Sequence, residues 1–160
     1  MDFYCVAQEI GESLTKQHKT VATAESITGG LIASTLVSIP NCSNWFLQGC
    51  VTYSNESKSD RLNVDNNTLI AYGAVLKQVA IEMAKGIRET AKSDIGISTT
   101  GYAGPAGGDV HNPVGTVFIG ISTENKSTAY KVKLLGNRNQ VRKQATILAL
   151  LFLQKEIALL

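Results

Sequence analysis

The stretch KQVAIEMAKGIRETAKSDIGIST, residues 77–99, contains the clearest helix of the chain and the strand that follows it. Apolar residues recur every four positions along one face of that helix, at Val79, Met83 and Ile87. Charged residues occupy its other faces, which is typical of an amphipathic surface helix. The short apolar run IGIST then has the length of a buried strand. The pattern therefore predicts a helix that ends near Lys92, followed by a strand.

Similar patterns predict helices and strands throughout the chain. Helices are predicted up to about Gln17, over 31–39 and from Asn139 onward, and strands over 20–25, 49–54, 117–121 and 129–134. The polar stretch 55–67 is predicted to be a loop with short helical turns. Helices are spread through the chain, and a short turn near Glu124 joins the last two strands. This order favours an α/β fold, a three-layer α/β/α sandwich with a mixed β-sheet.

Length and charge restrict the classes of protein. A chain of 160 residues is long enough to bury its own core, so we expect one domain over 1–160. Fifteen Lys and Arg residues against thirteen Asp and Glu residues give a net charge of +2, too small to indicate a nucleic-acid partner. The longest apolar run, 147–153, is much shorter than the roughly 20 residues that span a membrane. The N-terminus lacks the basic segment of a secretory signal. We therefore expect a cytoplasmic protein without nucleic-acid or membrane partners.

The cysteines indicate reduced thiols rather than disulfides or a metal site. Cys5, Cys42 and Cys50 form no CxxC pair, and the chain has only two histidines. We therefore expect reduced, buried thiols and neither a metal nor a cofactor.

The first segment that suggests chemistry is SITGG, residues 26–30. It joins a predicted strand to a predicted helix, where free N–H groups and the helix dipole create an anion site. Thr28 is a candidate helix cap, and Gly29 and Gly30 let another molecule approach the backbone closely. The spacing matches neither common phosphate-binding glycine motif, so an ordinary strand-to-helix turn is the alternative.

The second segment, 43–58, contains a hydroxyl, a phenol and an amine, those of Ser43, Tyr53 and Lys58. A serine becomes a nucleophile when a base removes its proton, and a lysine with a lowered pKa is such a base. A tyrosine can relay the proton. The alternative is a capping serine, a tyrosine at the edge of the core and a surface lysine.

The third segment is the loop 100–115, which has more glycine and proline than a simple connection needs. Arg138 and Arg142 follow near the start of the last predicted helix, four residues apart and so on one face. Arginines at a helix N-terminus oppose the helix dipole, which favours a compensating anion or carboxylate beside them. Solvated surface charges are the alternative.

Four motifs lie along the chain in the order and spacing of a known family. They are ATAESITGG at 22–30, VTYSNESK at 51–58, the segment from GYAGPAGG to NPVGTV at 101–117, and GNRNQVRKQA at 136–145. They resemble the CinA C-terminal-domain family, which includes the nicotinamide-nucleotide amidases in a stand-alone form. The resemblance implies a three-layer α/β/α fold. It also implies hydrolysis of nicotinamide mononucleotide (NMN) to nicotinate mononucleotide and ammonia, without a metal.

The resemblance also implies which groups perform the chemistry. The family's serine nucleophile and its tyrosine and lysine partners correspond to Ser43, Tyr53 and Lys58. On this hypothesis Ser43 Oγ attacks the amide carbonyl while Lys58, assisted by Tyr53, accepts the hydroxyl proton.

Five residues are expected to contact the substrate: Thr28, Gly29, Gly30, Thr100 and Arg138. Thr100 and Arg138 are implied by the resemblance. The turn formed by the other three follows from the helix-end argument, and we expect it to hold the nucleotide phosphate together with Arg138.

Two other functions remain as alternatives. Ile27 and Asn112 stand where the family usually has other residues, so an amidase for another small carboxamide is one alternative. A nucleotide-binding or interaction module without turnover is the other. The last helix has more apolar residues than one buried stripe requires, which favours a homodimer or higher homo-oligomer.

Overall fold

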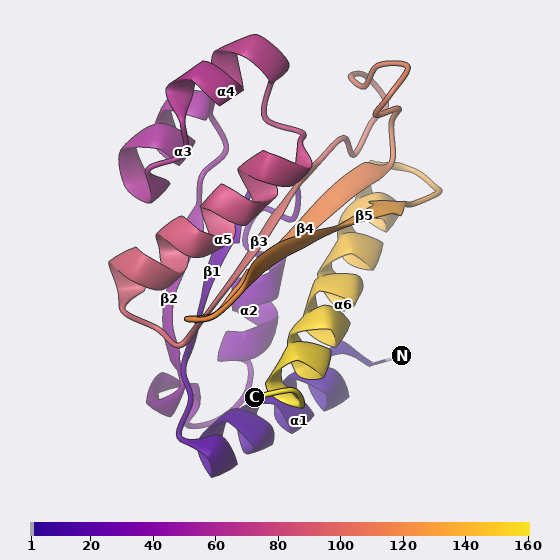
Figure 1. Ribbon diagram of the computed structural model, residues 1–160. Helices are drawn as coiled ribbons and strands as arrows, with labels where there is room; N and C mark the ends of the chain where they lie inside the picture. Colours follow the sequence, from indigo (N-terminus) through magenta and orange to yellow (C-terminus); the bar gives the residue numbers. More distant parts are fainter. Residues whose placement is uncertain (1) are drawn as a thin grey trace.

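Five strands form one mixed sheet in the order β2-β1-β3-β4-β5 (Figure 1). The structure is a computed structural model and describes residues 2–160. The strands are β1 (Val21–Glu25), β2 (Phe46–Val51), β3 (Ile95–Gly101), β4 (Thr116–Ser122) and β5 (Ser127–Lys133). β1 is parallel to β2 and β3, whereas β4 is antiparallel to β3 and β5. The mixed sheet expected from the sequence is therefore confirmed.

Helices cover both faces of the sheet and complete the expected α/β/α sandwich (Figure 1). One layer contains α1 (Phe3–Gln17), α2 (Leu31–Val37) and α6 (Arg138–Ile157). The other contains α3 (Asn55–Leu62), α4 (Asn66–Tyr72) and α5 (Lys77–Ala91). Buried apolar side chains fill the space between each layer and the sheet. No helix within residues 2–160 is both long enough and apolar enough to cross a membrane.

The stretch 55–67, predicted to be a loop, instead contains α3 and the first two residues of α4. Both helices begin at a residue that caps them. Ser54 Oγ accepts a hydrogen bond from the N–H of Ser57, and the Asp65 carboxylate accepts from two N–H groups of α4. The only apolar residues of the stretch 55–67 are Leu62 and Val64, so the periodicity that identifies α5 is absent from it. The prediction failed because it relied on that periodicity and not on the caps.

β2 begins and ends three residues earlier than the predicted range 49–54. The carbonyl of Trp45 already accepts a hydrogen bond from Val21 N–H, so pairing with β1 starts before the predicted strand does. β2 is an edge strand with mostly exposed side chains. The alternation of apolar and polar residues that marks a half-buried strand is therefore weak in it.

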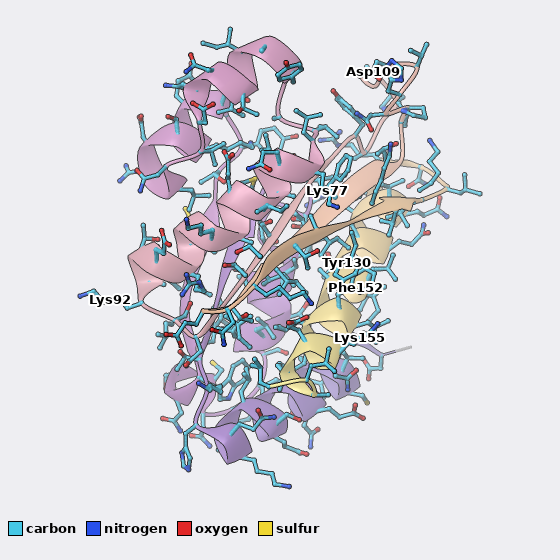
Figure 2. The ribbon with its side chains drawn as sticks, in the orientation of Figure 1. Lys77, Lys92, Asp109, Tyr130, Phe152 and Lys155 are labelled. Carbon is cyan, nitrogen blue, oxygen red and sulfur yellow. The ribbon has the colours of Figure 1, made fainter. Side chains whose placement is uncertain are left out.

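α6 is apolar on more than one side because it packs against the sheet and against α1 and α2. Phe152 of α6 also stacks on Tyr130 of β5, with ring centroids 4.3 Å apart (Figure 2). Contacts within one chain therefore account for the apolar residues on which the expectation of a homodimer rested. Self-association remains a prediction without that support.

The cysteines are free thiols, but their predicted burial is wrong, because Cys5 is exposed and Cys42 and Cys50 are half-buried. Within residues 2–160, no three His, Cys, Asp or Glu side chains group together as metal ligands.

The parallel strands bring three connections to one edge of the sheet, the edge formed by the carboxyl ends of β1, β2 and β3. β1, β2 and β3 all end at the upper edge in Figure 1, so the residues that follow them lie close together. The long connection after β3 rises above this edge, with Asp109 near its tip (Figure 2). Lys131 and Lys133 of β5 donate hydrogen bonds to backbone carbonyls of this connection. The fold thus gathers most of the predicted site at one place.

Candidate active site

A buried lysine occupies the edge of the sheet where β1 and β2 end. Lys58, on α3, is fully buried, and its Nζ donates to the backbone carbonyls of Thr52 at 2.7 Å and Tyr53 at 3.2 Å. It also lies 3.2 Å from Ser26 Oγ. Burial lowers the pKa of Lys58 from its ordinary value of 10.5 to about 8. About a tenth of Lys58 is therefore neutral at pH 7 and able to accept a proton.

Ser26 supplies the hydroxyl that Lys58 contacts. It is the first residue after β1, and its backbone N–H donates to Thr99 O at 3.0 Å, which extends the pairing with β3. Its side chain is half-buried. A hydroxyl beside an amine of lowered pKa is an arrangement in which lysine removes the proton and serine becomes the nucleophile. The pair is therefore suited to acyl transfer.

Ser26 and Lys58 line a pocket of about 260 Å³ at this edge. Three predicted site residues line it as well: Tyr53, Thr100 and Arg138. Its other walls come from Ile27, Ala74, Val75, Gly101, Tyr102, Ala103 and Ala106. Most of these are apolar, so the pocket combines one polar side with an apolar side. The roles predicted for Tyr53, Thr100 and Arg138 remain predictions.

Arg138 and Tyr53 are joined at the rim of the pocket. Arg138, the first residue of α6, donates from Nη2 to the Tyr53 hydroxyl at 3.0 Å and from Nη1 to Gly104 O at 2.9 Å. The Tyr53 side chain is 63% exposed. Its hydroxyl contacts Arg138, whereas it is its backbone carbonyl that contacts Lys58. The guanidinium therefore links the segment after β2 to the loop after β3 and places a positive charge at the rim.

Thr100, which lines the pocket, and Asn112 hold the segment of Ala74 and Val75 in place. The buried Thr100 donates its hydroxyl to Ala74 O at 2.8 Å, and Asn112 Nδ2 donates to Val75 O at 3.3 Å. Asn112 Oδ1 is buried without a hydrogen-bond partner among the residues that the structure describes. Asn112 thus acts on the pocket through the position of Val75.

The structure does not bring Ser43 to this site, which corrects its predicted place beside Lys58. Ser43 is exposed in a short 3-10 helix (Cys42–Asn44) that precedes β2, whereas Lys58 follows β2. Six strand residues separate the two ends of β2, a distance of about 20 Å. Ser43 and Lys58 therefore lie at opposite edges of the sheet, and Ser26 occupies the position that the sequence argument gave to Ser43.

The turn at Thr28, Gly29 and Gly30 is not available to a phosphate, which corrects a second expectation. The Glu25 carboxylate, only 1% exposed, accepts hydrogen bonds from the N–H groups of Gly30, Ile32 and Ala33. It also accepts the Thr28 hydroxyl at 2.7 Å. The anion site predicted at the start of α2 is therefore present, but a carboxylate of the chain itself fills it.

Glu25→Gln is expected to lower the free energy of unfolding by about 2–4 kcal/mol, because an amide NH₂ would face N–H donors and leave them unpaired. Urea unfolding of this variant and of Glu124→Gln, which changes an exposed residue, measures the difference. An unfolding free energy equal to that of the control would contradict the role assigned to Glu25.

The family model, the relatives and the solved structures that match this chain all point to one family. Residues 4–157 match the family described as the CinA C-terminal domain. The chain belongs to that family. A competence-damage inducible protein of Clostridium beijerinckii is 49% identical over 150 residues, and one of Clostridium botulinum is 47% identical over 148 residues. These alignments cover 94% and 92% of this chain but only 37% and 36% of the relatives, so the chain spans little more than a third of their length.

Solved structures of the CinA superfamily share the whole fold. A protein of Klebsiella pneumoniae superposes with a TM-score of 0.95 at 30% identity, and the alignment covers 100% of both chains. A competence/damage inducible protein of Agrobacterium tumefaciens superposes with a TM-score of 0.91 at 35% identity, covering 96% of this chain and 94% of that one. The predicted family and fold are therefore confirmed, whereas these names do not state a reaction.

Proposed function

We propose that this CinA domain is a serine amidase that hydrolyses NMN to nicotinate mononucleotide and ammonia, with Ser26 as nucleophile and Lys58 as base. The observation that carries the proposal is the contact between Lys58 Nζ and Ser26 Oγ at 3.2 Å inside a pocket. The lowered pKa of Lys58 makes its neutral form accessible. The resemblance to nicotinamide-nucleotide amidases supplies the choice of substrate.

The reaction proceeds in two halves. Neutral Lys58 takes the proton of Ser26 Oγ as the oxygen attacks the carboxamide carbon and forms a tetrahedral oxyanion. The intermediate collapses as Lys58 gives its proton to the leaving nitrogen, so that ammonia departs and a nicotinoyl ester remains on Ser26. Lys58 then takes a proton from water, the hydroxide attacks the ester, and the proton returns to Ser26. Nicotinate mononucleotide is released and the free enzyme is restored.

The other residues of the pocket bind and orient the substrate on this proposal. The apolar wall beside Tyr102 and Val75 holds the pyridine ring, and Thr100 contacts the substrate beside it. The Arg138 guanidinium binds the phosphate, because a planar fork of N–H donors suits phosphate oxygens. Tyr53, hydrogen-bonded to Arg138, lies between the reacting end and the phosphate end and completes the polar side.

Incubation of the protein with NMN, without added metal, tests this function. We expect ammonia and nicotinate mononucleotide to appear in equal amounts, and EDTA to have no effect. Binding of NMN by calorimetry without either product would favour a binding module without turnover. Release of ammonia from other small carboxamides but not from NMN would support the amidase mechanism and contradict NMN as the substrate.

A further inference from the structure

The turn after β1 contains two backbone donors that the fold leaves unused. The N–H groups of Ser26, Gly29 and Gly30 donate to Thr99 O, Ser26 O and the Glu25 carboxylate. Within residues 2–160, the N–H groups of Ile27 and Thr28 have no such acceptor. Ile27 directly follows Ser26 and lines the pocket, whereas Thr28 is fully buried. A free backbone donor next to a nucleophile is the kind of group that an oxyanion requires.

An arginine of α6, which lies in the same helical layer as α2, fixes the peptide units of this turn. Arg142 of α6 donates from Nε to Ile27 O at 3.1 Å and from Nη2 to Thr28 O at 2.9 Å. Ile27 O and the Thr28 N–H belong to one peptide group, and the C=O and N–H of a trans peptide point in opposite directions. The hydrogen bond from Arg142 to Ile27 O therefore directs the Thr28 N–H away from Arg142. The N–H of Gly29 donates a hydrogen bond to Ser26 O at 3.2 Å. Ser26 O shares its peptide group with the Ile27 N–H, so this bond fixes the direction of the Ile27 N–H in the same way.

The absence of a side chain at Gly29 leaves space for the Arg142 guanidinium beside the turn. Its φ of +60° lies in the left-handed region, and a β-carbon there would be 3.2 Å from Arg142 Nη2. Glycine therefore supplies both the backbone conformation and the space for the guanidinium. The hydrogen bonds from a charged donor also polarise the peptide groups that carry the N–H groups of Thr28 and Gly29, and this strengthens the hydrogen bond from Gly29 N–H to Ser26 O.

We infer that the N–H group of Ile27 binds the oxyanion, and that Arg142 is the positioning residue that orients it through Thr28 O and the Gly29 N–H. This inference rests on the proposed serine amidase mechanism. Arg142 touches neither the substrate nor Lys58. It acts through two backbone carbonyls, so its removal lowers the rate of the chemical step and leaves substrate binding and the Lys58 pKa in place.

Arg142→Met is expected to lower kcat for NMN about 100-fold, with KM changed by less than about threefold. Arg142→Lys retains one charged donor and is expected to restore part of the loss. The pH midpoint of kcat stays at the wild-type value in both variants, because Lys58 is unchanged. Lys143→Met removes a charge from the neighbouring exposed residue of α6 and serves as the matched control. Wild-type kcat in Arg142→Met, or a loss confined to KM, would overturn the inference. So would a shifted pH midpoint.

A second readout separates this inference from the choice of substrate. A fluorophosphonate forms a bond from phosphorus to an activated serine oxygen and releases fluoride, and its P=O occupies the oxyanion site. Mass spectrometry of the intact protein measures the labelling rate. If the wild type labels at Ser26 but does not release ammonia from NMN, the substrate is wrong, and slower labelling of Arg142→Met still supports the inference. Equal labelling rates contradict it, and a wild type that shows neither activity overturns both proposals.

Discussion

Ser26→Ala is expected to lower the rate of ammonia release from NMN by about 10⁴-fold or more, because it removes the atom that forms the acyl intermediate. Within residues 2–160, Lys58 Nζ is the only hydrogen-bond partner of the Ser26 hydroxyl, so its loss leaves the backbone hydrogen bonds of the turn in place. Binding of NMN by calorimetry is therefore expected to remain close to that of the wild type. The measurement is the joint rate of formation of ammonia and nicotinate mononucleotide.

Ser43→Ala provides the matched control, since it makes the same change at an exposed position at the other edge of the sheet. Its rate is expected to be within about twofold of the wild type. The reverse result, an inactive Ser43→Ala and an active Ser26→Ala, would contradict the assignment from geometry. Equal activity in all three proteins would show that neither serine is the nucleophile.

The two serines show what a sequence alone could decide here. Ser26 directly follows a strand, and Lys58 lies beyond the end of the next one, whereas Ser43 precedes that strand. Ends of parallel strands meet at one edge, so the position of each residue relative to its strand already favours Ser26. The sequence argument instead assigned Ser43 from the family resemblance, without asking at which end of its strand the residue lies. Applying the strand-end rule to the predicted elements was sufficient to find Ser26.

Glu25 shows what the sequence did not reveal. A strand followed by a glycine turn and a helix predicts an anion site, and the structure contains one. Its occupant is a side chain at the end of β1, in a strand that is buried along its whole length. Periodicity reports burial but not the partner of a buried polar group, so the occupant depends on tertiary contacts. The same holds for Arg142, whose acceptors are carbonyls more than 110 residues away in the chain.

The helices rich in apolar residues were predicted, whereas the polar α3 was not. α5 buries the repeating side chains on which its prediction rested, and its observed end differs from the expected one by a single residue. α3 buries only Lys58 and Leu62, so most of its sequence is polar. The base of the proposed mechanism thus lies on the helix with the weakest apolar signal. Its burial comes from the loops around it and not from an apolar stripe.

The pH dependence of turnover is expected to follow the deprotonation of Lys58. Its neutral form is the base, so kcat rises with pH and levels off above the pKa of about 8. Two pH units below that midpoint, the rate is expected to be about 100-fold below the plateau. Lys58→Arg and Lys58→Met remove the base and are expected to show no such rise, with rates about 10⁴-fold lower at the plateau. A wild-type rate that does not change with pH between about 6 and 9 would contradict a lysine base.

The same pKa predicts an effect on folding that does not depend on the substrate. The folded state lowers the pKa of Lys58 from 10.5 to about 8, so between these values the unfolded chain binds more protons than the folded one. Stability therefore rises with pH across this window. From about pH 8 to pH 10 the wild type is expected to gain about 2 kcal/mol relative to Lys58→Met, in which the linked proton is absent. Urea unfolding of both proteins at the two pH values measures the difference, and parallel curves would show that Lys58 titrates normally and is not poised to act as a base.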